Sequence, residues 1–208
     1  METNQETDEK KRVGLQGILL LFTLLSLACS GSKVTVTPDT KSEKTNPNQY
    51  QQIRLKVQYR DQAQKYSGKI TLNRQSEIKK IYFLDPLNQV IFKLLMSGEK
   101  THAVNPRKRR FWQGHFHVFI QRYWNLRLQF EDFYQLIIAG TIPAHLKQRY
   151  HVKIERNKSG IPETIQISRK DQWLRLTIRK NRMLDGRLDF LINQKHLSPV
   201  DIDQLFEK

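Results

Sequence analysis

The sequence of 208 residues contains a single thiol, Cys29, in the stretch LLSLACSGSK. A lone thiol can be an ordinary buried side chain, a reactive or metal-binding group, or the point at which a lipid is attached. The residues before it favour lipid attachment. Basic KKR precedes an apolar stretch, residues 13–28, which ends in the small residue Ala28. A basic segment, an apolar segment and a small residue in this order are typical of a secretory signal.

Residues 26–29, SLAC, resemble a bacterial lipobox with serine in place of the usual leucine. In a lipobox the cysteine is diacylated, the signal is removed before it, and the new amino terminus is acylated, for example with palmitate. As a helix the apolar stretch would extend about 24 Å, less than the ~30 Å hydrocarbon core of a bilayer. We therefore predict a signal peptide over 1–28 and a lipid anchor at Cys29. Ser30, rather than aspartate, resembles the signal for the outer membrane. A plain cleaved signal, an uncleaved anchor and a structural thiol are the alternatives.

The rest of the chain offers no set of residues typical of catalysis. His115 and His117 in GHFH could bind a metal from one strand face, but no nearby carboxylate or further histidine completes a set. Glu131 and Asp132 are adjacent, so they diverge on a helix and suit its first turn better than acid/base chemistry. The sequence has no GxSxG elbow, HExxH motif or glycine-rich phosphate loop. We predict a protein that is not an enzyme and that uses no metal or cofactor.

The formal charge of +16, from 36 basic and 20 acidic residues, points to an anionic partner. Without a compartment, nucleic acid would be the first candidate. Export changes this expectation, because the nearest anions are then phospholipid and lipopolysaccharide head groups. The densest basic patch is RKRR, comprising Arg107, Lys108, Arg109 and Arg110. We predict that it contacts an anionic membrane surface or forms a solvated hairpin tip, and that the protein does not bind nucleic acid.

Alternation of apolar and polar residues dominates the chain after residue 49. In IRLKVQYR, residues 53–60, every second side chain is apolar, and the pattern recurs in GKITLN, RYHVKIER, ETIQIS and WLRLTIRK. Such alternation predicts an antiparallel sheet with one apolar and one basic face. Residues 29–48 are polar and rich in Ser, Thr, Lys, Pro and Asn, which predicts an unstructured tether. Residues 49–208 then form one domain without cysteine, whose stability must come from a packed core.

Three segments break this alternation with helical patterns. Helices are predicted across 118–124 and across 130–138, the latter ended by Gly140 and Pro143. The final SPVDIDQLFEK predicts a closing helix with Ser198 as N-cap and Pro199 at the first helical position. These helices must bury their apolar stripes on the inner face of the sheet. The prediction is therefore an α+β fold, a curved antiparallel sheet with helices on its concave apolar face, and the inner space can be either filled or open.

Three segments resemble the LolB family of outer-membrane lipoprotein receptors, within the LolA/LolB superfamily. They are IKKIYFLDPLNQVIFKLLM at 78–96, FEDFYQLIIAGTIP at 130–143 and GIPETIQISRKDQWLRLTI at 160–178. The resemblance implies an unclosed β-barrel whose helix-covered concavity holds acyl chains. A periplasmic LolA-like carrier would supply acylated lipoproteins, and this chain would insert them into the outer membrane. It would act as a lipid-anchored, periplasm-facing and monomeric chaperone of lipoprotein transport.

The resemblance also implies roles for individual residues. The exposed turn leucine that the family needs for membrane insertion of its cargo falls on Leu87, after Pro86, with Asn88 in place of a turn glycine. The alternative is that Leu87 folds back onto the core. Ten apolar positions are predicted to line the acyl-chain cavity, namely Leu55, Val57, Ile70, Leu72, Phe92, Phe133, Ile137, Ile154, Ile165 and Leu176.

Two further functions are compatible with the sequence. The first is a lipoprotein of the same fold that binds other lipids. The second is an accessory lipoprotein with a filled core, which would bind anionic lipid, lipopolysaccharide or a protein partner through its basic surface. Apolar lining residues do not separate these functions, because they look the same in a lipid cavity and in an ordinary core.

Overall fold

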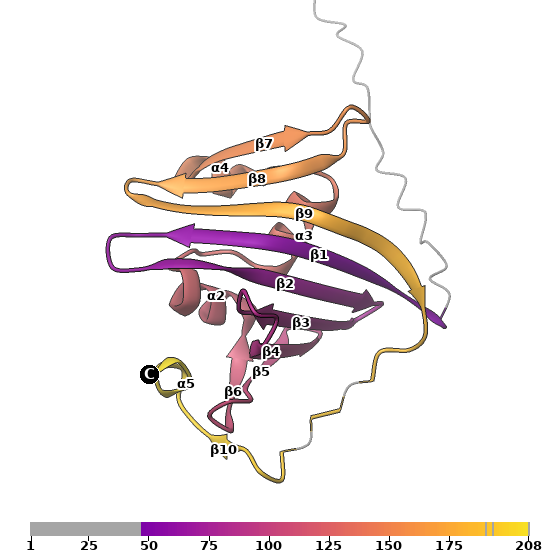
Figure 1. The fold of residues 1–208 in the computed structure, drawn as a ribbon, viewed down its shortest axis with the longest axis vertical. Coiled ribbons are helices and arrows are strands. Elements are labelled where there is room, and N and C mark those ends of the chain that lie inside the picture. Colours follow the sequence, from indigo (N-terminus) through magenta and orange to yellow (C-terminus); the bar gives the residue numbers. More distant parts are fainter. Residues whose placement is uncertain (1–46, 190, 193, 208) are drawn as a thin grey trace, which may run out of the picture. The chain divides into compact units, whose positions relative to one another are not determined.

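The computed structural model describes residues 47–189, 191–192 and 194–207 (Figure 1). The predicted signal peptide, Cys29 and nearly all of the predicted tether lie outside these residues. Among the residues described, no helix is both long enough and apolar enough to span a membrane.

The described part of the chain forms one sheet of ten strands, with neighbours in the order β10-β6-β5-β4-β3-β2-β1-β9-β8-β7. The strands are β1 Gln49–Arg60, β2 Lys65–Gln75, β3 Ile78–Leu84, β4 Val90–Ser97, β5 Lys100–Asn105, β6 Arg110–His115, β7 His151–Arg156, β8 Pro162–Arg169, β9 Gln172–Asp185 and β10 Ser198–Pro199. Every neighbouring pair is antiparallel except β10 with β6, which is parallel. The first and last strands of this order do not pair with each other, so the sheet is not closed.

The two faces of the sheet differ in polarity, as the alternation predicts. On β1, Leu55 and Val57 are buried, whereas the intervening Arg54 and Lys56 are exposed. The sheet is curved, and the helices lie on its concave side (Figure 1). The predicted α+β fold, an unclosed curved sheet with helices on the concave apolar face, is confirmed.

The helices that the structure describes are α2 Phe116–Trp124, α3 Phe130–Ile138, α4 Ala144–Arg149 and α5 Ile202–Phe206. The predicted helix across 118–124 is confirmed and begins two residues earlier. Helix α3 has the predicted bounds. It starts with a capping box between Gln129 and Asp132, and Gly140, with φ of 61°, follows its end. The short helix α4 was not predicted.

The end of the chain differs from its prediction. Ser198 and Pro199 form the edge strand β10 rather than a helix start, because β6 and the residue before it offer free carbonyls. The Ser198 N–H donates to Arg109 O at 2.8 Å, and the Val200 N–H donates to Phe111 O of β6 at 2.9 Å. Proline is tolerated there because an edge strand can lack one donor. Helix α5 starts later, where Asp201 and Gln204 form a capping box.

Candidate functional site

The ten predicted cavity residues all come together on the concave side. Nine of them have side chains at most 4% exposed, and the tenth, Ile154, is half-buried. All ten belong to or pack against one continuous apolar cluster, to which β1, β2, β4, β7, β8, β9 and α3 contribute. Phe133 and Ile137 come from helix α3 and the other eight residues come from the strands. The covering helix and the sheet thus pack directly against each other.

Helix α2 adds aromatic side chains that the sequence analysis did not single out, and they pack against Phe92, one of the predicted cavity residues. Phe83 and Phe92 of the sheet, Phe119 and Tyr123 of α2, and Phe206 of α5 have neighbouring ring centroids 5.0–5.8 Å apart. Burial raises the pKa of the Tyr123 phenol far above its ordinary value, so this side chain stays neutral. The i, i+4 spacing of the two α2 rings was the signal that could have identified them.

The start of α3 is attached to the rim of the sheet by a few polar contacts, here called the α3 rim contacts. Lys79 Nζ lies 3.5 Å from Glu131 Oε1 and 4.9 Å from the centroid of the Phe130 ring. Tyr134 Oη donates to Gln51 Oε1 at 2.6 Å. Arg74 lies over the Tyr134 ring at 4.1 Å.

Lys79 is the unusual member of these contacts. It occupies an inward position of β3 and is only 6% exposed, although alternation alone predicts an apolar residue there. It lines an opening of about 540 Å³ together with Met96, Phe116 and Phe130. This opening lies between the strand rim and the start of α3, and its residues Met96, Phe116 and Phe130 belong to the apolar cluster.

The same opening is lined by His115, His117 and Glu131. The His115 and His117 rings stack at 5.6 Å, and no cluster of three metal-ligating side chains occurs in the described ranges. Glu131 and Asp132 lie in the first turn of α3, as predicted, with Glu131 near Lys79 and Asp132 accepting from the Gln129 N–H at 3.2 Å.

Leu87 lies at the tip of the β3–β4 turn and is 77% exposed, so it does not fold back onto the core. The turn closes through Asn88 N–H to Asp85 O and Asp85 N–H to Gln89 O, both at 3.0 Å, and Asn88 has a φ of 66°. The backbone N–H of Gln89 and the guanidinium of Arg107 hold the pKa of Asp85 below its ordinary value. Pro86, the other residue predicted for insertion, is also exposed.

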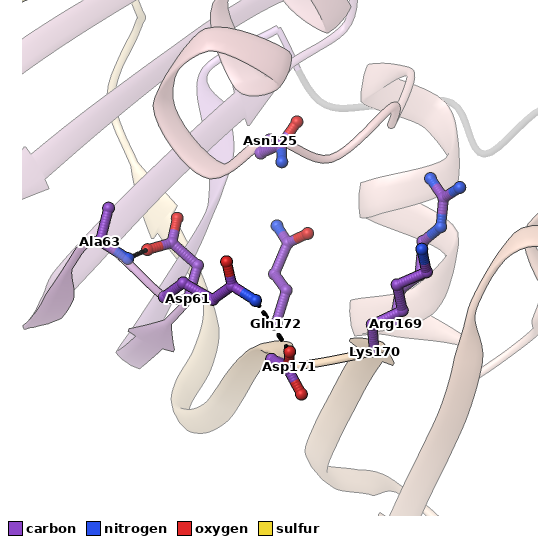
Figure 2. Close-up of a pocket in the computed structure, with 8 residues that line it drawn as sticks. Asp61, Ala63, Asn125, Arg169, Lys170, Asp171 and Gln172 are labelled. Carbon is purple, nitrogen blue, oxygen red and sulfur yellow. Dashed lines mark hydrogen bonds between the residues drawn. The ribbon is translucent and has the colours of Figure 1, made fainter.

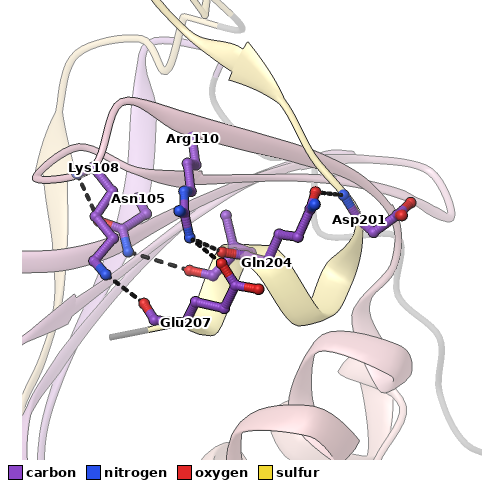
Figure 3. A network of polar contacts seen from close by, with 7 residues as sticks. Asn105, Lys108, Arg110, Asp201, Gln204 and Glu207 are labelled. Carbon is purple, nitrogen blue, oxygen red and sulfur yellow. Dashed lines mark hydrogen bonds and ion pairs between the residues drawn. The ribbon is translucent and has the colours of Figure 1, made fainter.

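The RKRR patch covers the β5–β6 turn and Arg110, the first residue of β6, and three of its four side chains bind the chain itself. Arg107 Nη2 lies 2.6 Å from Asp85 Oδ2, and Lys108 donates to the backbone of Glu207. Figure 3 shows that Arg110 contacts both Gln204 and Glu207. Arg110 donates to Gln204 O, and its Nη1 lies 3.3 Å from Glu207 Oε2. The patch predicted to meet an anionic surface is thus engaged largely with the β3–β4 turn and α5.

A second depression, of about 380 Å³, lies where the β1–β2 and β8–β9 turns meet Asn125 at the end of α2 (Figure 2). Asp61 accepts from the Ala63 N–H at 2.9 Å within the β1–β2 turn. Gln62 Nε2 donates to Asp171 Oδ2 at 2.9 Å and so joins the two turns. The Gln62–Asp171 hydrogen bond thus gives this depression a structural part in holding the two turns together.

Comparison with known proteins gives a likeness in structure and none in sequence. No protein-family model matches the chain, and no curated protein matches it. Among solved structures, the chain is similar to the crystal structure of a LolA superfamily protein from Nitrosomonas europaea. The TM-score is 0.35 at 8% identity, and the match covers 74% of this chain and 92% of that chain. A likeness of this extent assigns no activity.

Proposed function

We propose that this protein is a lipid-anchored outer-membrane receptor, which accepts acylated lipoproteins from a periplasmic carrier and inserts them into the outer membrane. The observation that carries the proposal is a one-sided apolar sheet whose covering helix α3 is attached at the rim through few polar contacts. Moving an acyl chain between apolar sites is driven by apolar burial, at about 25 cal/mol per Å². Such a transfer needs no catalytic group.

Movement of α3 is the step that would admit an acyl chain. Its apolar side, with Phe133 and Ile137, packs on the strand positions where the acyl chain would lie. A hydrogen bond contributes about 0.5–1.5 kcal/mol and a part-exposed ion pair about 0–1 kcal/mol. The rim contacts therefore oppose opening only modestly, and the larger cost is exposure of the concave face, which an acyl chain would cover again.

Delivery would use the exposed turn. A leucine at the tip of a turn has no polar partner in water and gains free energy when it enters hydrocarbon. The three segments that resemble the LolB family include this turn, which supports placing Leu87 at the membrane during transfer. We propose that the receptor works as a monomer facing the periplasm.

Photo-crosslinking in cells tests the proposal on the complete chain. A photoreactive phenylalanine analogue at Phe133 lies on the concave side, and the same analogue at Tyr82, on the other face of β3, is the matched control. After labelling with radioactive palmitate, we expect lipoprotein adducts from position 133 and few from position 82. Equal yields, or no labelled adduct from position 133, would contradict acyl binding.

An accessory lipoprotein with a filled core is the second candidate. The observation that favours it is the tight burial of the predicted cavity residues, nine of which are at most 4% exposed. The same crosslinking experiment separates the two functions, because a permanently filled core excludes acyl chains from position 133.

A further inference from the structure

A groove of about 700 Å³ crosses the convex face of the sheet, opposite to the helices. We call it the convex groove. Five basic side chains line it, namely Arg54, Lys56, Lys69, Arg179 and Lys180, and no acidic residue does. These five residues come from β1, β2 and β9, so no single stretch of sequence contains them.

Strand register explains why the charges gather. Lys56 lies directly opposite Lys69 on β2, and Arg54 lies opposite Lys180 on β9. A bulge between Arg54 and Leu55 leaves Arg179 without a partner on β1. Arg179 and Lys180 of β9 therefore both lie next to Arg54. Like charges directly opposite each other destabilise a sheet, so this arrangement costs free energy in the unbound protein.

The chain does little to neutralise these charges. None of the five forms an ion pair with a carboxylate of the described residues. Arg54 and Lys69 instead donate to neutral oxygens, Gln52 Oε1 at 3.1 Å and Asn88 Oδ1 at 2.6 Å. Since repulsion inside the groove is not relieved internally, an external anion would relieve it.

The surroundings of the groove indicate the source of that anion. Pro86 and Asn88 line the groove, and between them lies Leu87, which is 77% exposed. An apolar tip beside an open row of positive charges matches a membrane surface, where hydrocarbon lies just beneath phosphate groups.

We propose that the convex groove binds the phosphate groups of anionic lipids in a membrane surface while Leu87 enters the acyl region. This site is separate from the concave face, and it stands whether or not that face takes up acyl chains. The groove would fix the orientation of the domain on the bilayer, with the β3–β4 turn toward the lipid.

Lysine acetylation measured by mass spectrometry tests the site on the full chain. The protein is reconstituted with vesicles of phosphatidylcholine alone or with vesicles that also contain phosphatidylglycerol. We expect Lys56, Lys69 and Lys180 to react about fivefold more slowly with the anionic vesicles. Lys153, which is paired with Glu155, and Lys158 serve as internal controls and should react equally with both.

Three outcomes would overturn the proposal. The first is equal reaction of the groove lysines with both kinds of vesicle. The second is full protection by inorganic phosphate added to neutral vesicles, because the groove would then take free phosphate. The third is stronger protection by single-stranded DNA than by anionic vesicles, because the groove would then be a nucleic-acid site. None of these readouts involves palmitate adducts at Phe133, so failure here is distinguishable from failure of the acyl-binding proposal.

Discussion

Two basic regions contact the same turn, residues 85–89, and they use their charge differently. In the β5–β6 turn, Arg107 pairs with Asp85 and Arg110 pairs with Glu207. In the convex groove, Lys69 donates to the neutral Asn88 and lies opposite Lys56. Arg54 likewise lies opposite another base, Lys180. A dense run of basic residues is therefore not automatically a surface for an anionic partner. A basic run is available to an anionic partner only where the fold does not bring acidic residues into contact with it.

The largest effect is expected at the turn that both regions contact. Leu87→Glu should abolish delivery of lipoprotein cargo, because it places a charge where hydrocarbon is expected. The free energy of unfolding should change by less than about 0.5 kcal/mol, since the side chain is exposed. Membrane fractionation of labelled lipoproteins and chemical denaturation measure the two quantities. Leu87→Met is the matched control, and normal delivery by a folded Leu87→Glu variant would contradict the role.

The next largest effect is expected when the accessible positive charge of the convex groove is removed. In the full chain carrying Cys29→Ala, replacing Lys56, Lys69 and Lys180 with glutamine should weaken the preference for anionic over neutral vesicles about 100-fold, or about 1 kcal/mol per lysine. Sedimentation with vesicles measures this ratio. The control variant replaces Lys147, Lys153 and Lys158, which removes the same charge elsewhere. An equal loss in both variants would mean that net charge, and not the groove, determines binding.

In the β5–β6 turn, removing charge should affect stability instead. Arg110→Ala removes the contacts to Gln204 O and Glu207, so it should lower the free energy of unfolding by about 1 kcal/mol. Arg109→Ala is the matched control, because no partner for the Arg109 side chain is found within the described ranges. Urea denaturation measures both variants. If they lose the same stability, the internal use of Arg110 is wrong.

The smallest effect has the opposite sign. Lys56→Gln removes one member of the Lys56–Lys69 pair and should raise the free energy of unfolding by about 0.2–1 kcal/mol at low salt. The gain should shrink as salt screens the repulsion. A loss of stability that is independent of salt would show that the pair is not repulsive in the folded protein.

Alternation predicted the faces of the strands well, because a strand with one wet face repeats every two residues. Ile53, Leu55 and Val57 are all buried, as are Ile70 and Leu72. Helix α3 was predicted with its observed bounds, since its apolar spacing and the following Gly140 are local signals. The β3–β4 turn lies where the family resemblance implied it, at Pro86 and Leu87.

What the sequence did not predict depends on partners far along the chain. The groove requires the register of β1 against β9 and the bulge between them, and neither can be read from one strand. Strand β10 exists because β6 offers an edge, and Lys79 is tolerated inside because Glu131 and Phe130 approach it. The sequence showed no acidic partners for the RKRR patch, because Asp85 and Glu207 lie far from it along the chain.

The position of β1 in the sheet has a consequence for the order in which the chain can fold. β1 is the first described strand, yet it lies between β2 and β9, and β9 spans Gln172–Asp185. One edge of β1 therefore stays unpaired until nearly the whole chain has emerged from the ribosome. Pairings between such distant segments are slow to form, because loop closure precedes any gain from contact. The strands β1 to β6 can pair in sequence order as they emerge, whereas the sheet around β1 is complete only after β9 has been synthesised.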